Sequence, residues 1–457
     1  MAKGMYGSIG GVTKKIKKQY CVIGGVTKKI KKVYAVVGGV TRLVWNGGGI
    51  TPLYTGLVHA FYTPGDPSYG SSYNPASGCW KMYTRNGTSI TQNTSYINYS
   101  SYTANQGSGK TSHEQAQFNF SANGQTGFYC YSWYDDYNHN NTIILYTYNK
   151  NTGSYDYTKI ADSKSGSSTY TVDYLFQAAG VITVSTSNRA QCADSYVFVN
   201  QNGDKCLFVD ITIGGKIVGI LCNISGKTIS YDKTIFNLPL SILSDVHASD
   251  DLETIAVSSL YQYSGYTKGV YIYKRDDSYN YTQIFKSEVT KDTHYARKVF
   301  VSRDGQYVML PDLSYGVGNS VSQLYYVNGN SVTKTSFMTN SGYNTSYFIK
   351  NQGSQTRDGK FLSIAKHSNP QNSTYSGSLF KFKTDGATIT RLDSGSYEIN
   401  TVGFSDFSEN DDYCIYAGQV CACSRASNGD ITVGNTISTL TPSGYKPLCG
   451  RFIDTSF

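Results

Sequence analysis

One short turn recurs along the sequence and constrains the fold more than any other feature. It is a cluster of Asp, Asn and Gly between two apolar runs, centred near residues 123, 203, 250, 304, 358 and 410, with gaps of 80, 47, 54, 54 and 52 residues. The flanking runs are rich in Val, Ile, Phe, Tyr and Thr, which favour strands. A repeat of this kind indicates one structural unit that the chain uses several times.

The unit contains four strands, most clearly between residues 298 and 336. Apolar runs at 298–302 and 306–310 flank the turn Arg303-Asp304-Gly305, and two more follow at 323–327 and 331–335. A four-stranded unit of this length is typical of a propeller blade, and a closed ring leaves few strand edges open. We therefore expect an all-β fold, a β-propeller over residues 46–457. A weaker unit at 53–95 brings the count to seven four-stranded blades, with six or eight still open.

The turn Ser302-Arg303-Asp304-Gly305 resembles the S-x-D-G signature of seven-bladed propellers, a fold that hosts binding, scaffolding and catalysis alike. The Asp-Gly pairs are interpreted as hairpin-turn chemistry rather than as metal loops. The long gap between the first two turns contains the apolar runs 171–176 and 181–184, which we interpret as an insertion or an extra hairpin. No helix is expected beyond residue 50.

Residues 1–45 form a second, shorter repeat, which we treat as a separate arm. Gly-Gly-Val begins at residues 10, 24 and 38, a period of 14, and residues 24–32 copy 10–18 without a change. A Gly-Gly pair costs about 2 kcal/mol inside a helix, whereas between two β-forming runs it is a hairpin-turn signal. We expect each copy to be a β-hairpin. A hairpin of this size is marginal alone, so we expect a binding partner to order it.

The positive charge of the chain lies in this arm. Residues 1–45 hold ten basic side chains and no acidic one, which leaves 30 basic and 31 acidic residues in 46–457 and accounts for the net charge of +9. A basic arm on a neutral body favours attachment through the arm and another contact through the body. A flexible basic tag and nucleic-acid binding remain alternatives. Membrane insertion is disfavoured, because no apolar run approaches 18 residues.

No catalytic or metal-binding motif is visible, so we expect no enzymatic activity and no cofactor. The six histidines form no metal-binding pair, although His59 and His247 lie near expected innermost strands. A pair of carboxylates brought together only in space, as in glycosidases, leaves no local motif and stays open. The ten cysteines follow no disulfide framework, and residues 1–10 lack the apolar core of a secretory signal. We expect free thiols and assembly in a reducing cytoplasm.

The arm also resembles a known group of sequences. The copies at 10–18 and 24–32, with the truncated copy at 38–42, resemble the Lys-rich repeated N-termini of virion structural proteins from tailed bacteriophages of Gram-positive hosts. The resemblance implies a virion component of the tail or baseplate, whose arm docks on acidic surfaces of other virion proteins. The implied docking residues are Lys14, Lys15, Lys17, Lys18, Tyr20, Lys28, Lys29, Lys31, Lys32, Tyr34 and Arg42.

The propeller would then face outward. With 42 Tyr in a chain rich in Asn and Ser, it has the composition of binding surfaces and would contact host-surface glycan or protein, or other particle proteins. Two alternatives stay open: a capsid or neck decoration protein without a receptor role, and a propeller enzyme that degrades envelope polysaccharide.

Overall fold

The computed structural model describes most of residues 56–454 and, before them, six strands of the arm. Between 56 and 454 the structure does not describe residues 64–76, 87, 99–114, 136–137, 163–170, 183–195, 213–215, 239–241, 261–268, 289–293, 297–298, 316–318, 342–352, 368–376, 393–402 and 444–445.

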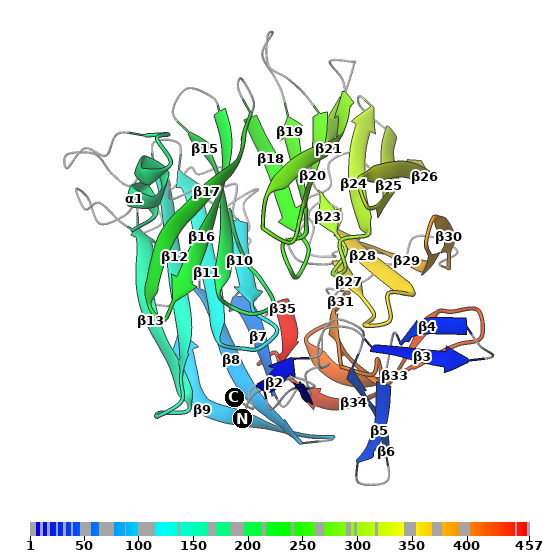
Figure 1. Ribbon diagram of the computed structural model, residues 1–457. Helices are drawn as coiled ribbons and strands as arrows, with labels where there is room; N and C mark the ends of the chain where they lie inside the picture. The colour runs from blue at the N-terminus through cyan, green and yellow to red at the C-terminus, as the bar shows by residue number, and fades with distance from the viewer. Residues whose placement is uncertain are drawn as a thin grey trace.

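Seven antiparallel sheets stand around a common axis as the blades of a propeller (Figure 1). Blade 1, from the axis outward, is β35 (Lys446–Ile453), β7 (Gly56–Thr63), β8 (Ser77–Asn86) and β9 (Ser89–Asn98). In the same direction, blade 2 is β10 (Gln115–Phe120), β11 (Thr126–Asp135), β12 (Asn138–Asn149) and β13 (Ser154–Asp162). Blade 3 is β14 (Tyr196–Val199), β15 (Lys205–Thr212), β16 (Lys216–Ser225) and β17 (Thr228–Leu238).

The remaining four blades follow the same order. Blade 4 is β18 (Ile242–Ala248), β19 (Thr254–Leu260), β20 (Gly269–Arg275) and β21 (Tyr281–Glu288). Blade 5 is β22 (His294–Ala296) and β23 (Phe300–Val301), then β24 (Tyr307–Tyr315), β25 (Asn319–Asn328) and β26 (Ser331–Ser341). Blade 6 is β27 (Gly353–Gln355), β28 (Phe361–His367), β29 (Gly377–Asp385) and β30 (Thr388–Arg391). Blade 7 is β31 (Phe404–Phe407), β32 (Tyr413–Tyr416), β33 (Gln419–Arg425) and β34 (Ile431–Thr439).

The expected all-β propeller of seven blades is confirmed, and the weak unit at 53–95 is blade 1. Its innermost strand comes from the other end of the sequence, because β35 pairs antiparallel with β7, with Ile453 opposite Gly56. This pairing closes the ring. In blade 5 the expected strand at 298–302 is shorter than predicted, and two short strands, β22 and β23, both pair with β24.

The recurring sequence turn is the connection between the first and second strands of blades 2 to 7. It has five residues in all six blades, at 121–125, 200–204, 249–253, 302–306, 356–360 and 408–412. In blade 5, Ser302 Oγ donates to Asp304 Oδ1 at 2.7 Å, and the N–H of Gly305 donates to Ser302 O at 2.9 Å. The fourth residue has a φ between +59° and +74° in all six turns, as Gly, Leu252 or Asp411. The interpretation of these turns as hairpin chemistry is confirmed.

The hydrophobic core formed by the described residues is divided into seven clusters, each lying between two neighbouring blades. Blades 2 and 3, for example, share a cluster that includes Phe128 and Phe208, whose ring centroids lie 6.0 Å apart. Tyrosines contribute much of this packing, and Tyr146, Tyr307 and Tyr325 are almost wholly buried. Many tyrosines of the described blades therefore serve the core rather than a binding surface.

The expectation of no helix beyond residue 50 is wrong. The run 171–176, interpreted as an insertion or an extra hairpin, begins helix α1 (Thr171–Ala178). Its buried residues Val172, Leu175 and Phe176 are spaced as one helical face and join the cluster between blades 2 and 3. Gly180 follows with a φ of +71°, and Val181 N donates to Phe176 O at 3.1 Å, a helix-ending arrangement. The insertion is thus a helix that covers the outer side of two blades.

The arm forms three separate two-stranded hairpins, as expected. They are β1 (Tyr6–Ile9) with β2 (Val12–Lys15), β3 (Gln19–Ile23) with β4 (Val26–Ile30), and β5 (Val33–Val37) with β6 (Val40–Trp45). The first two hairpins pair equivalent residues of the repeat, since Tyr6 lies opposite Lys15 and Tyr20 lies opposite Lys29. In the third hairpin Tyr34 lies opposite Leu43, so the basic residue of the pair is lost.

Seven cysteines whose surroundings the structure describes are free thiols, as expected: Cys130, Cys206, Cys222, Cys414, Cys421, Cys423 and Cys449. In the described part of the chain, no helix has the length and apolar character needed to span a bilayer.

Candidate functional site

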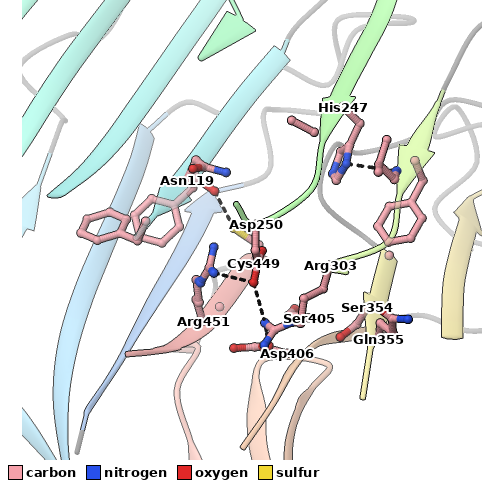
Figure 2. Close-up of a pocket in the computed structure, with 17 residues that line it drawn as sticks. Asn119, His247, Asp250, Arg303, Ser354, Gln355, Ser405, Asp406, Cys449 and Arg451 are labelled. Atoms are coloured by element: carbon pink, nitrogen blue, oxygen red, sulfur yellow. Dashed lines mark hydrogen bonds and ion pairs between the residues drawn. The ribbon is translucent and has the colours of Figure 1, made fainter. Parts of the chain in front are cut away.

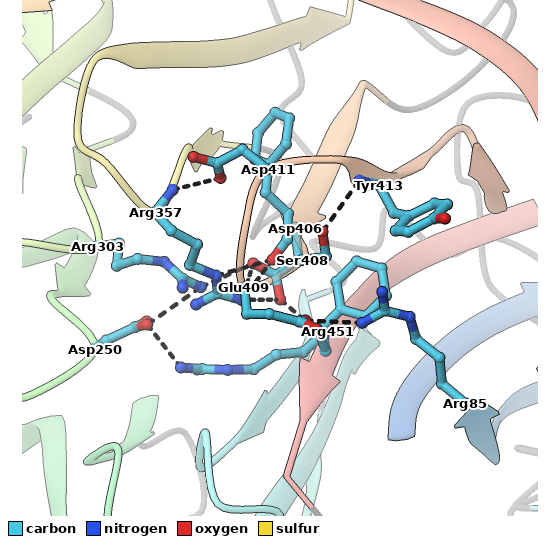
Figure 3. A network of polar contacts seen from close by, with 12 residues as sticks. Arg85, Asp250, Arg303, Arg357, Asp406, Ser408, Glu409, Asp411, Tyr413 and Arg451 are labelled. Atoms are coloured by element: carbon cyan, nitrogen blue, oxygen red, sulfur yellow. Dashed lines mark hydrogen bonds and ion pairs between the residues drawn. The ribbon is translucent and has the colours of Figure 1, made fainter. Parts of the chain in front are cut away.

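Charged side chains gather where the five-residue turns meet the propeller axis (Figure 3). The second residue of the turn is charged in blades 4 to 7, as Asp250, Arg303, Arg357 and Glu409. The innermost strands add Asp406 from β31 and Arg451 from β35. The ring of blades thus brings Asp250 and Arg451, which are 201 positions apart in sequence, into one network.

Asp406 lies at the centre of this network and is 2% exposed. Its Oδ1 accepts from Arg303 Nη2 at 2.8 Å, and its Oδ2 lies 2.9 Å from Arg357 Nη2. The N–H of Phe452 also donates to Oδ2 at 2.7 Å. Burial raises the pKa of Asp406 to about 6, although Arg303 and Arg451 oppose the shift. Asp406 therefore ties blades 5, 6 and 7 to the closing strand.

Asp250 connects Arg303 to Arg451. Its Oδ2 lies 2.7 Å from Arg451 Nη2 and 3.3 Å from Arg303 Nη2. Three guanidinium groups therefore share two carboxylates, which leaves an excess of one positive charge at the axis when both acids are ionised. A separate pair, Arg85 and Glu409 at 2.7 Å, joins blade 1 to the turn of blade 7.

A cavity of about 100 Å³ opens beside this network (Figure 2). Its lining comes from the innermost strands of six blades and the adjoining turns, and includes His247, Asp250, Arg303, Gln355, Asp406 and Arg451. Guanidinium groups recognise carboxylates and phosphates through paired hydrogen bonds, so the chemistry of this lining suits binding of small polar or anionic groups.

His247 is on the innermost strand β18, as expected, and lines the cavity. Burial lowers its pKa to about 4. The N–H of Val301 donates to Nδ1 at 3.1 Å, so the neutral ring carries its proton on Nε2. His59 is on β7, the second strand of blade 1 rather than an innermost one. Its Nε2 lies 2.9 Å from Thr441 Oγ1, and burial lowers its pKa to about 3. No cluster of metal-binding side chains occurs among the described residues.

The arm residues proposed for docking are distributed over the hairpins. Lys14 and Lys15 are in β2, Tyr20 in β3, Lys28 and Lys29 in β4, Tyr34 in β5 and Arg42 in β6. Lys17, Lys18, Lys31 and Lys32 lie outside the described residues. Register places Cys21 opposite Lys28 and Ala35 opposite Arg42.

The charged residues at the propeller axis were not predicted from the sequence, although part of the signal was available. Arg303 and Arg357 occupy the same place in the repeated Arg-Asp-Gly turns, and Asp250 and Glu409 are their equivalents in blades 4 and 7. Aligning the turns would have shown that the four residues hold equivalent positions in neighbouring blades. Asp406 and Arg451 carry no local motif.

Comparison with known proteins finds no matching family model and no matching curated protein. Solved structures share the architecture at low identity. A "putative 6-phosphogluconolactonase" from Bacteroides fragilis is 12% identical, with 88% of this chain and 98% of that chain covered and a TM-score of 0.46. One from Bacteroides uniformis is 11% identical, with 87% and 100% covered and a TM-score of 0.48. TolB from Acinetobacter baumannii is 12% identical, with 76% and 65% covered and a TM-score of 0.37. At these values the likeness transfers no activity to this chain.

Proposed function

We propose that this protein is a structural component of a bacteriophage virion, associated with the tail or baseplate. Residues 1–45 dock on acidic surfaces of other virion proteins, and the propeller contacts the host surface or other parts of the particle. The observation that carries the proposal is the charge partition. Nine of the ten basic residues of the arm fall in copies of a unit that repeats every 14 residues, while residues 46–457 have 30 basic and 31 acidic side chains.

The hairpin register supports a docking role. Equivalent Tyr and Lys residues hold opposite positions in the register of the first two hairpins, so the units can present the same chemistry to a partner that itself repeats. Like-charged hairpins repel one another in solution, and acidic partner surfaces would remove that repulsion. Repeated weak contacts add up steeply when they are linked in one chain.

The propeller supplies a rigid body with contact groups at its periphery. Among the described large apolar residues, Tyr157 on β13 and Tyr174 on α1 are exposed to 68% and 55%. Tyrosine gives large contact area at low entropic cost, a property used in binding surfaces. At the axis, the carboxylate of Asp406 is held by Arg303 and Arg357, which favours a binding or structural role for the body over hydrolysis.

Charge reversal in the arm tests the docking role. The full chain carrying Lys14→Glu, Lys15→Glu, Lys28→Glu and Lys29→Glu should be incorporated into assembled particles at least about tenfold less than wild type, because attraction to acidic partners becomes repulsion. Quantitative mass spectrometry of purified particles measures incorporation.

The matched control reverses four exposed lysines of the propeller, Lys150, Lys227, Lys334 and Lys360, with the same change in net charge. It should be incorporated normally. Equal incorporation of the arm variant and this control would contradict the proposal.

A further inference from the structure

Beside the cavity at the propeller axis lies a guanidinium edge whose donors make no hydrogen bond with the described residues. Nε and Nη2 of Arg451 are both buried and make no hydrogen bond with any described residue. Nη2 lies 2.7 Å from Asp250 Oδ2, close enough for an ion pair but without hydrogen-bond alignment. Buried donors in proteins are nearly always hydrogen-bonded, so an unsatisfied guanidinium edge calls for an acceptor.

The other two arginines of the network differ from Arg451 in this respect. Arg357 donates from Nε and Nη2 to Phe407 O, at 2.9 and 2.7 Å, and from Nη2 to both oxygens of Asp406. Arg303 is held by Asp406 at 2.8 Å. Arg357 is therefore anchored to the protein, whereas Arg451 has donor capacity left for something that enters the cavity.

The cavity has the size and position for a small acceptor. Arg451 and Asp250 both line it, and so do Arg303 and Gln355 (Figure 2). A volume of about 100 Å³ exceeds the roughly 10–15 Å³ that one water needs by the same kind of measure. It accommodates several waters or one small oxyanion, but no large ligand.

We infer that this cavity is a binding site for a small oxyanion, a phosphate or carboxylate group, held by the guanidiniums of Arg451 and Arg303 beside Asp250. The excess of one guanidinium over the two carboxylates provides the charge. The paired N–H groups on one edge of Arg451 match two oxygens of such an anion. Because this edge is buried against Asp250, the anion reaches it by displacing the Asp250 carboxylate. Asp250 is the competing internal anion, because its carboxylate already lies against both arginines.

This site is independent of the role proposed for the arm. The phosphate or carboxylate group that the site would bind has two possible sources, a free anion or an anionic group carried by a polymer. A terminal phosphate monoester presents three unsubstituted oxygens and carries chain on one side only. An internal diester presents two, carries chain on both sides and needs an open path through the cavity.

Calorimetric titration of the full-length chain at pH 7.5 tests the inference, with inorganic phosphate, methyl phosphate, dimethyl phosphate and acetate as probes. We expect wild type to bind inorganic phosphate at millimolar concentration or below. Arg451→Gln should weaken that binding about tenfold or more, the effect of one charge-assisted pair. Arg391→Gln, which removes the same charge from an exposed site on β30, should leave binding unchanged.

Asp250→Asn provides an independent readout if Arg451→Gln fails to fold. Removing the competing carboxylate should tighten phosphate binding several-fold. Methyl phosphate binding without dimethyl phosphate binding would assign the site to a free ion or a chain end, whereas binding of both would assign it to a polymer linkage as well. The inference is overturned if wild type binds none of the four probes at millimolar concentration, if Arg451→Gln binds phosphate as wild type does, or if Asp250→Asn weakens binding.

Discussion

Individual residues of the repeated turn are constrained in two ways, by backbone conformation and by the neighbouring blade. Gly305 has a φ of +70°, and a Cβ there would lie 2.5 Å from Oγ1 of the buried Thr254 in blade 4. Thr254 Oγ1 also donates to Gly305 O at 2.9 Å. Gly329, in the outer turn between β25 and β26, has a φ of +57° and nothing within 4 Å of the same position. Comparing Gly305 with Gly329 therefore separates the effect of backbone conformation from the effect of contact with the neighbouring blade.

We predict that Gly329→Ala costs about 1 kcal/mol of unfolding free energy, the cost of the left-handed backbone alone. Gly305→Ala should cost about 3 kcal/mol, because the methyl group must also displace Thr254. Urea unfolding of both variants measures the difference. Equal losses would show that contact between the blades at this turn contributes nothing.

A partly buried carboxylate in the turn of blade 7 should make stability depend on pH. Burial and the nearby charge of Asp358 raise the pKa of Asp411 from 3.8 to about 7. The folded protein therefore holds this proton up to about pH 7, whereas the unfolded chain releases it near 3.8. The contribution of the group to stability falls as pH rises through that window.

Asp411→Asn should remove this effect. Asparagine tolerates the φ of 60° at this position. In the wild type the N–H of Arg357 donates to Oδ1 of Asp411 at 2.6 Å, and the amide oxygen of asparagine keeps an acceptor for it. We expect a gain of about 1–2 kcal/mol in unfolding free energy at pH 8, with more than half of it lost at pH 5. The exposed Asp277→Asn should show no such pH dependence. A gain that is the same at both pH values would rule out the titration of Asp411 as its cause.

At the scale of single elements, the sequence predicted the strands and the turns between them, but not the helix. The turns at 302–306 and 356–360 are marked by Ser or Thr followed by Arg-Asp-Gly, and both separate a first from a second strand as expected. Helix α1 was missed because Val, Tyr and Phe in 171–176 favour strands, while the spacing of Val172, Leu175 and Phe176 is helical. Packing against blades 2 and 3 decided between the two patterns.

The candidate site shows why assembly in space is harder to predict than local structure. The turn repeat identifies Arg303 and Arg357 as equivalent residues, and this equivalence alone places them near each other. Asp406 and Arg451 lie in the innermost strands of different blades, β31 and β35, so only the closed ring reveals that they meet. The same holds for the closing pair Ile453 and Gly56, which are separated by nearly the whole propeller sequence.

At the scale of the whole molecule, one strand holds the ring closed. Without β35, strand β7 would present an unpaired edge to the axis, and the fully buried Phe452 and Ile453 would leave their clusters. Asp406 would lose the N–H of Phe452, and Asp250 would lose Arg451. Removing buried side chains of this size costs about 2–5 kcal/mol each, against a typical total stability of about 5–15 kcal/mol.

We therefore predict that a chain of residues 56–445 loses cooperative unfolding, whereas a circular permutant of the same blades retains it. The permutant places residues 446–454 before Gly56, with Asp454 as the first residue of a five-residue turn like those of the other blades. This connection is possible because Ile453 already lies opposite Gly56. Far-UV circular dichroism during urea unfolding should show one transition for the permutant and a gradual change for the truncated chain. If both unfold with the same midpoint and slope, the strand pairing of β35 does not hold the ring together.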